Sequence, residues 1–466
     1  MPNPIIETLG VFDWLLLVLA LSVVFGFEFV NGFHDTANAV ATVIYTHSLK
    51  PWLAVVWSGF CNFLGVYLGG IAVAFTIVHL LPVDLLVHIN THAGIGMVFA
   101  LLAAATIWNF GTWYLALPAS SSHALIGSIL GVGLANSILA GKGFGVGVNW
   151  TMAGEVGLSL LFSPAVGFGL AAVLLLVAKR LIPSQQLYRP PEGDEPPPGW
   201  IRAILIVTCT GVSFAHGSND GQKGVGMVML ILIGLVPAHY ALNLRSDAAR
   251  IAQTRQAAEE LGTLLAAAPA AHANDAQRHL AEITRRLAGA TSYAKFTPDE
   301  RWQLRTALLG LGSSLKRRIA ELGDALDPRE RSRLRDLRAK LLEPIEYAPP
   351  WVLLAVACSL GVGTTVGWKR IVVTVGEKIG KAHLTYGQGA CAELVAMGTI
   401  GLADRFGFPV STTHVLSSAV AGTMAANRSG VQLDSVKKIA LAWVLTLPAT
   451  MVLSGAFLCL FRVFWR

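Results

Sequence analysis

Residues Gly32–Val40 read Gly-Phe-His-Asp-Thr-Ala-Asn-Ala-Val and follow an apolar run that extends from residue 14 to residue 27. Within five positions they place an imidazole, a carboxylate and an amide, on His34, Asp35 and Asn38. An ionisable group at membrane depth costs about 3 kcal/mol even on the scale derived from membrane insertion, so such groups are kept where they act. The stretch therefore indicates a functional site inside a membrane span.

The motif occurs twice. Gly217–Val225 reads Gly-Ser-Asn-Asp-Gly-Gln-Lys-Gly-Val, so both copies fit Gly-x-[His/Asn]-Asp-x-x-[Asn/Lys]-[Ala/Gly]-Val. A second pair of motifs, Pro118–His123 and Pro409–His414, fits Pro-[Ala/Val]-Ser-[Ser/Thr]-[Ser/Thr]-His. The interval from the first motif to the second is 83 residues in the first half and 189 in the second, a difference of 106. That difference equals the length of a hydrophilic insert at 242–347, so the spacing predicts an internal duplication.

The composition is that of an integral membrane protein. Of the 466 residues, 54% are hydrophobic and 14% are charged, and the mean hydropathy is +0.58; a soluble chain carries about 25% charged residues. The insert alone holds 18 of the 35 Lys and Arg residues. The net charge of +7 is therefore better explained by bases on the cytoplasmic side than by nucleic-acid binding. The five cysteines lack metal-ligand or disulfide spacing, and we expect them to be packing residues.

We expect an all-α polytopic membrane protein with two inverted-topology repeats, broken helices or re-entrant hairpins, and a soluble helical insert. Apolar runs long enough to span a bilayer lie at about 12–31, 52–79, 94–116, 155–182, 201–217, 224–241, 351–368, 386–403 and 437–461. The glycine-rich run at 52–79 is over-long and is expected to tilt or bend. The expected domains are a first repeat (1–182), a Pro-rich linker (183–200), the start of the second repeat (201–241), the insert (242–347) and the remainder of the second repeat (348–466).

The insert reads as three or four amphipathic helices. Thr297-Pro298-Asp299-Glu300 and Asp327-Pro328-Arg329-Glu330 each place a cap residue, a proline at the first helical position and a glutamate two residues later. Asn274 is expected to cap a third helix, and Ser246 or Asp247 a fourth. The sequence offers no ligand motif there, so a structural or docking module is favoured over a regulatory one.

The Ser/Thr clusters predict an oxyanion site. A hydroxyl residue just after a proline is a strong N-cap, so helices should begin inside the membrane at 120–122 and 411–413. The N–H groups and positive dipole end of such a helix bind anions without a cationic side chain. Asp35 and Asp220 would repel that anion, so a proton or a metal ion must lie between them and couple the two cargoes.

Several of these residues also have a structural interpretation. A single serine on a membrane helix commonly bonds to the carbonyl four residues earlier, although two matched triplets favour function. His34, His123 and His414 could orient the hairpins as core residues or relay protons. Glu28 and Glu155 are expected to be solvated or packing residues, whereas Glu393, in the middle of an apolar run, is a functional candidate. No hydrolase-like spacing accompanies the serines, so we expect no enzyme and no cofactor.

Both motif pairs resemble those of the inorganic phosphate transporter (PiT) family over nearly the whole chain, and most closely its bacterial low-affinity branch. The resemblance implies proton-driven transport of phosphate, largely as a neutral complex with a divalent metal such as Mg²⁺ or Ca²⁺, through a midplane site. It also implies inverted repeats, two hairpins, a homodimer and a bacterial inner-membrane location.

The resemblance assigns roles to particular residues. It implies phosphate binding by Ser120, Ser121, Ser122, Ser411, Thr412 and Thr413, and coupling by Asp35, Asn38, Asn219, Asp220 and Glu393. Two residues depart from the sodium-coupled pattern: His34 replaces an asparagine, and Lys223 stands where Asn38 should repeat. An ammonium there occupies the space of a coupling metal ion, so we predict proton coupling. Lys223 either pairs with an aspartate or titrates, unless it extends to the membrane surface.

The sequence thus predicts a secondary transporter that imports inorganic phosphate by proton symport. One alternative is a sulfate permease on the same fold; phosphate that keeps an O–H donor could be told from sulfate by an acceptor such as Asp35 or Glu393. The other alternative is an anion channel, against which the costly carboxylates and the duplication argue.

Overall fold

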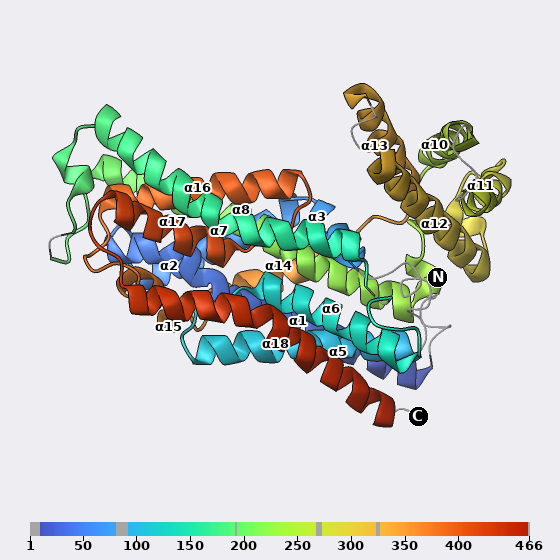
Figure 1. Ribbon diagram of the computed structural model, residues 1–466, viewed down its shortest axis with the longest axis horizontal. Helices are drawn as coiled ribbons and strands as arrows, with labels where there is room; N and C mark the ends of the chain where they lie inside the picture. The colour runs from blue at the N-terminus through green and yellow to red at the C-terminus, as the bar shows by residue number, and fades with distance from the viewer. Residues whose placement is uncertain are drawn as a thin grey trace. The chain divides into compact units, whose positions relative to one another are not determined.

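The computed structural model describes residues 10–80, 92–146, 148–191, 193–266, 273–322 and 327–464, and these form an all-helical protein (Figure 1). The chain divides into two compact units, of which the larger contains 18–80, 96–228 and 349–464 and the smaller is built mainly from 229–348. The helices of the first half are α1 (Val11–Tyr45), α2 (Pro51–Leu68), α3 (Ala72–Val78), α5 (His92–Tyr114), α6 (Ser121–Leu139) and α7 (Trp150–Leu181). Those of the second half are α8 (Gly199–Leu235), α9 (Pro237–Tyr240), α10 (Ala248–Ala266), α11 (Ala273–Leu287), α12 (Pro298–Leu322), α13 (Pro328–Leu342), α14 (Pro350–Thr364), α15 (Lys369–Glu377), α16 (Tyr386–Arg405), α17 (Thr412–Ala426) and α18 (Leu433–Phe464).

Seven of the described helices are long and apolar enough to cross a membrane: α1, α2, α5, α6, α7, α8 and α18. The pair α14 and α15 passes the same test together and is bent by 66° between its two parts. Large apolar side chains such as Leu161, Phe162 and Val452 lie exposed on α7 and α18. Exposed apolar surface of this extent is suited to lipid. The expected all-helical membrane protein is confirmed.

The helices that carry the first motif are not broken, which corrects an expectation. α1 runs for 35 residues and α8 for 37, each continuous through its motif, so the separate runs expected at 201–217 and 224–241 are joined in one helix as far as Leu235. Neither motif contains a proline, and the polar side chains find partners on other helices, so the backbone has no need to unwind. Glycines instead permit close packing. A Cβ on Gly32 would lie 2.3 Å from a carbonyl oxygen of α14, and one on Gly217 would lie 2.2 Å from a carbonyl oxygen of α2.

The run at 52–79 bends, as expected. α2 ends at Leu68 and α3 begins at Ala72, and Gly70 between them has a φ of +99°. Only glycine adopts this conformation at no steric cost. The bend allows the backbone N–H of Val73, on α3, to donate to Gln222 of α8 over 2.7 Å.

α6 and α17 begin at the Ser/Thr clusters, as the sequence predicted. Ser120 caps α6 by accepting from the backbone N–H of His123, and Ser411 caps α17 by accepting from that of His414. Loops at 115–120 and 406–411 join these helices to α5 and α16. α6 packs along α18, and α17 packs along α7 (Figure 1). We call α6 and α17 the hairpin helices. Each hairpin helix thus packs on the last long helix of the other half of the chain.

Four helices, α10 to α13, form most of the smaller unit. The capping box at α12 is present: Thr297 Oγ1 accepts from the N–H of Glu300, and Glu300 Oε2 accepts from that of Thr297. Asp327 caps α13, and Asp247 accepts from the N–H of Arg250 at the start of α10. The side chain of Asn274 lies outside the described residues.

Candidate functional site

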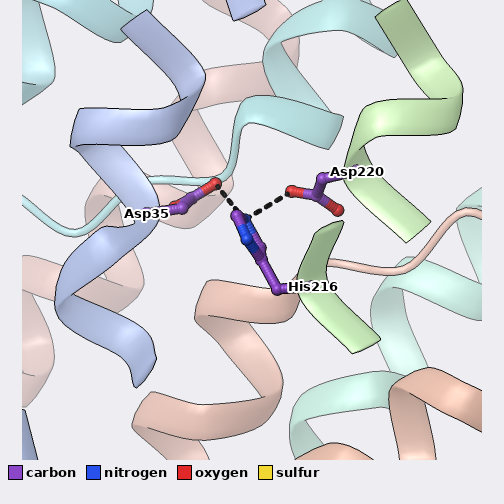
Figure 2. Close-up of side chains that lie close together, drawn as sticks. All are labelled: Asp35, His216 and Asp220. Carbon is purple, nitrogen blue, oxygen red and sulfur yellow. Dashed lines mark ion pairs between the residues drawn. The ribbon is translucent and has the colours of Figure 1, made fainter. Parts of the chain in front are cut away.

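Asp35 of α1 and Asp220 of α8 lie on either side of the imidazole of His216 (Figure 2). His216 Nε2 is 3.8 Å from Asp35 Oδ2 and 3.4 Å from Asp220 Oδ2. All three side chains are buried. The two copies of the first motif therefore meet at one point in the protein.

The other ring nitrogen of His216 fixes the orientation of the ring. Nδ1 lies 2.7 Å from Asn62 Oδ1 on α2, and because an amide oxygen only accepts, Nδ1 carries the donated proton. A neutral ring would then turn the lone pair of Nε2 toward two carboxylates. A second proton on the ring, a proton on one carboxyl or a cation relieves that repulsion. The ligand atoms of these three side chains lie within 4.8 Å of one another, which suits a small cation as well as a proton.

The hydroxyls at the starts of α6 and α17 converge on the same aspartates. Ser121 donates to Asp35 Oδ2 over 2.7 Å, and Thr413 donates to Asp35 Oδ1 over 2.6 Å. Thr412 donates to Asp220 Oδ2 over a longer 3.4 Å. Both predicted oxyanion-binding clusters are thus brought to the aspartates, and three of their hydroxyls hydrogen-bond to carboxylate oxygens.

Lys223 is buried, with 1% of its side chain exposed, so it does not extend to the membrane surface. Its Nζ lies 2.5 Å from Asp220 Oδ1 and 2.5 Å from Ser122 Oγ. Ser122 in turn donates to the carbonyl oxygen of Val410, in the loop that precedes α17. Lys223 therefore joins the second motif to the first Ser/Thr cluster and to the second hairpin.

The remaining motif residues position the site. Asn219 donates to the carbonyl oxygen of Phe408 over 3.1 Å and accepts from the N–H of Val410 over 3.4 Å, so its amide holds the loop before α17. His34 lies 3.2 Å from Asp35 Oδ1 through Nδ1 and 3.2 Å from Thr112 Oγ1 through Nε2. The side chain of Asn38 lies outside the described residues.

His123 and His414 form a ring pair between the two hairpins. Their centroids lie 4.4 Å apart, and His414 stacks on Trp443 of α18 at 4.0 Å. Trp443 also donates to the carbonyl oxygen of Pro118. These contacts fit a core role that orients the hairpins.

Two further carboxyls are buried. Glu393 on α16 is fully buried, hydrogen-bonds to Thr208 of α8 and lies beside Thr42 of α1, seven residues after Asp35. Its part in coupling stays a prediction. Glu28, expected to be solvated or a simple packing residue, is fully buried inside α1 beside α8.

Sequence reasoning missed His216 and Asn62. His216 immediately precedes the second motif and lies four residues before Asp220, on the same helix face. A search one helical turn before Asp220 could have found it. Asn62 belongs to no repeated pattern, and only the packing of α2 against α8 shows its role.

Comparison with known proteins gives consistent results. A model of the phosphate transporter family matches residues 31–454. Two low-affinity inorganic phosphate transporters of Escherichia coli strain K12, PitB and PitA, are each 43% identical to this chain. PitB covers 96% of the chain and 97% of its own length, and PitA covers 95% of each. A solved structure, "The sodium-dependent phosphate transporter", shares the fold with a TM-score of 0.59 at 18% identity, over 96% of this chain and 99% of the other.

Proposed function

Because this chain belongs to the phosphate transporter family, we propose that it imports inorganic phosphate across the bacterial inner membrane by proton symport. It is a multi-pass membrane protein of a transporter family and not an enzyme. Its relatives are named as low-affinity transporters of inorganic phosphate, which supports the same cargo here.

The observation that carries the proposal is the competition for hydroxyl donors. Ser121 and Thr413 donate to the carboxylate of Asp35, whereas phosphate bound at the starts of α6 and α17 needs the same hydroxyls. An anion can take these donors only when the carboxylate releases them, and a protonated carboxyl competes for donors far less. Phosphate binding and proton binding therefore favour each other, which is the thermodynamic basis of symport.

The charges at the site agree with this reasoning. Asp35 and Asp220 carry two negative charges when ionised, and Lys223 offsets one of them. Phosphate would add one or two more in a buried setting, so at least one proton or another cation must accompany it. We favour the proton because the ammonium of Lys223 already occupies the position between Asp220 and Ser122.

We further propose that the two halves are inverted repeats with the phosphate site at the midplane. Three features support this: the motif glycines of α1 and α8 pack on α14 and α2 respectively, each hairpin helix packs on the last long helix of the other half, and the motif aspartates meet. The hairpins are then re-entrant. A homodimer, and Mg²⁺ or Ca²⁺ travelling with phosphate, belong to the same proposal. Asp35, His216 and Asp220 offer the oxygen and nitrogen ligands that a transient cation needs.

The carboxylates of the motif aspartates, as hydrogen-bond acceptors, favour phosphate over sulfate as cargo. The dihydrogen and monohydrogen forms of phosphate keep an O–H donor that sulfate lacks at neutral pH. An ionised motif aspartate can accept a hydrogen bond from that O–H. If sulfate were bound instead, the carboxylate would face a sulfate oxygen with no hydrogen between them, and this mismatch costs binding energy.

Uptake of radiolabelled phosphate into proteoliposomes tests the proposal. An inward proton gradient should drive accumulation that a protonophore abolishes, sodium does not change and excess sulfate does not inhibit. The same preparation with and without Mg²⁺ reports on the metal complex. A strict sodium requirement or inhibition by sulfate would contradict the proposed coupling or cargo, and uptake that never exceeds equilibrium would indicate a channel.

A further inference from the structure

Glu28 is a carboxyl that the proposed function does not use. It lies on α1 seven residues before Asp35, which is two helical turns along the same face. Its side chain is fully buried, and among the described residues no cation lies within ion-pair distance of its carboxylate. Its polar neighbour is the neutral amide of Asn31, which is likewise buried and lies between the two carboxyls on that face.

The carboxyl lies directly against α8 at the second motif. A Cβ on Gly224 would be 2.5 Å from the carboxyl carbon and from Oε1 of Glu28, so only glycine fits opposite it. The charged or titratable groups that act on Glu28 are Asp220, Lys223 and His216, all on α8. Glu28 therefore lies close to the Lys223–Asp220 pair.

An isolated carboxylate is unstable in such a setting. Without a partner it would lose its hydration and gain nothing in return, so a buried carboxyl takes up a proton or pairs with a cation. A lysine lies close by, because Lys223 neighbours Gly224, but its ammonium is bound to Asp220 at 2.5 Å. Glu28 and Asp220 are thus two carboxyls near one ammonium, which pairs with Asp220.

We propose that Glu28 is a proton-binding residue of the symport cycle and that it controls the position of Lys223. With a proton on Glu28, Lys223 remains on Asp220, neutralises it and allows phosphate to bind at the hydroxyls. When Glu28 releases that proton toward the cytoplasm, the new carboxylate attracts Lys223 and leaves Asp220 bare. The bare carboxylate then repels phosphate. Proton loss and phosphate release are coupled in this way, and the inference rests on the proposed proton symport.

Glu28→Gln tests the inference, because glutamine has the shape of the protonated acid and cannot release a proton. In proteoliposomes, phosphate exchange without a gradient should stay within about threefold of the wild type. A gradient of one pH unit supports about tenfold accumulation of phosphate for each coupled proton. The variant should therefore accumulate about tenfold less phosphate than the wild type, because the proton carried by Glu28 is lost. The pH dependence of phosphate binding should flatten as well. Glu155→Gln, which changes an exposed carboxyl on α7, is the matched control and should behave as the wild type.

The outcomes separate this inference from the proposed function. Full accumulation by Glu28→Gln would overturn the role of Glu28 and leave proton symport intact. Loss of exchange together with accumulation, in a variant that melts like the wild type, would make Glu28 a binding or packing residue and also overturn it. Failure of the wild type to accumulate phosphate in a pH gradient would instead overturn the proposed function. If Glu28→Gln does not fold, Glu28→Asp should keep coupling with a shifted pH midpoint, and an unchanged midpoint would contradict the inference.

Discussion

Replacing Lys223 by asparagine removes the cation of a buried pair and leaves oxygen atoms around its position. Lys223 Nζ lies 2.5 Å from Asp220 Oδ1, 2.5 Å from Ser122 Oγ and 3.4 Å from the carbonyl oxygen of Val410. Removing one partner of a buried ion pair costs about 3–5 kcal/mol, because the other charge is left uncompensated. We therefore expect Lys223→Asn to melt well below the wild type in sodium-free detergent.

Sodium should restore part of that loss. Carboxylate, hydroxyl and carbonyl oxygens are the ligands that hard cations prefer, and the shorter asparagine leaves room for an ion. A cation at one hundred times its Kd returns about 2.7 kcal/mol of folding stability. Phosphate uptake by Lys223→Asn should accordingly become stimulated by sodium, whereas wild-type uptake should not respond.

Thermal melting in detergent and phosphate uptake into proteoliposomes, each with sodium or choline, measure the two effects. Lys438→Asn is the control, because Lys438 is an exposed lysine on α18, and it should show neither a lower melting temperature nor a response to sodium. If sodium changes neither the melting nor the uptake of Lys223→Asn, the ammonium does not stand in for a coupling cation, and the reasoning fails.

Three further predictions follow from other contacts. Thr413→Val removes a hydroxyl that now donates to Asp35 and that we propose phosphate takes over; a hydrogen bond to a charged group contributes about 1.5–3 kcal/mol, so the KM for phosphate should rise about tenfold or more, and an unchanged KM would exclude this hydroxyl from the phosphate site. Gly217→Ala places a Cβ 2.2 Å from a carbonyl oxygen of α2, whereas a Cβ on Gly154 meets nothing within 4 Å. Expression and melting should therefore collapse for the first variant and not for Gly154→Ala, and equal stability of the two would contradict the close packing. In the insert, burial raises the pKa of Glu346 to about 7 from 4.5. The stability that this group contributes is complete below pH 4.5 and lost as the pH rises through about 7. Backbone hydrogen exchange of the insert, corrected for intrinsic rates, should therefore be slower at pH 6 than at pH 8. Glu346→Gln should remove this difference.

Local chemistry made much of the fold predictable. The N-caps of α6 and α17 could be read from serine after proline, because capping depends on a few neighbouring residues. The capping box at Thr297 and the bend at Gly70 were predictable for the same reason. The continuity of α1 and α8 was not, since a polar motif in a membrane helix is satisfied either by unwinding or by partners on other helices. Only packing decides between the two.

The site was predictable in membership and less so in geometry. The repeated motifs identified Asp35, Asp220 and the two hydroxyl clusters, and the structure brings them together. His216 lay outside the repeated pattern. The burial of Glu28 was missed because the apolar run was expected to end near residue 31, whereas α1 continues to Tyr45. Glu393 was assigned to coupling by the resemblance, and its contacts with Thr208 and Thr42 could not be read from the sequence, because they depend on how α16 packs on α8 and α1.

The most direct test of the central claim is proton uptake on phosphate binding. Purified protein in detergent is titrated with phosphate in buffers of different ionisation enthalpy, and calorimetry then gives the number of protons bound for each phosphate. We expect net proton uptake near neutral pH, beyond what phosphate itself requires, and a smaller value for Asp35→Asn. Binding of phosphate without proton uptake, unchanged by that substitution, would show that the motif aspartates do not need to be neutralised and would contradict the account.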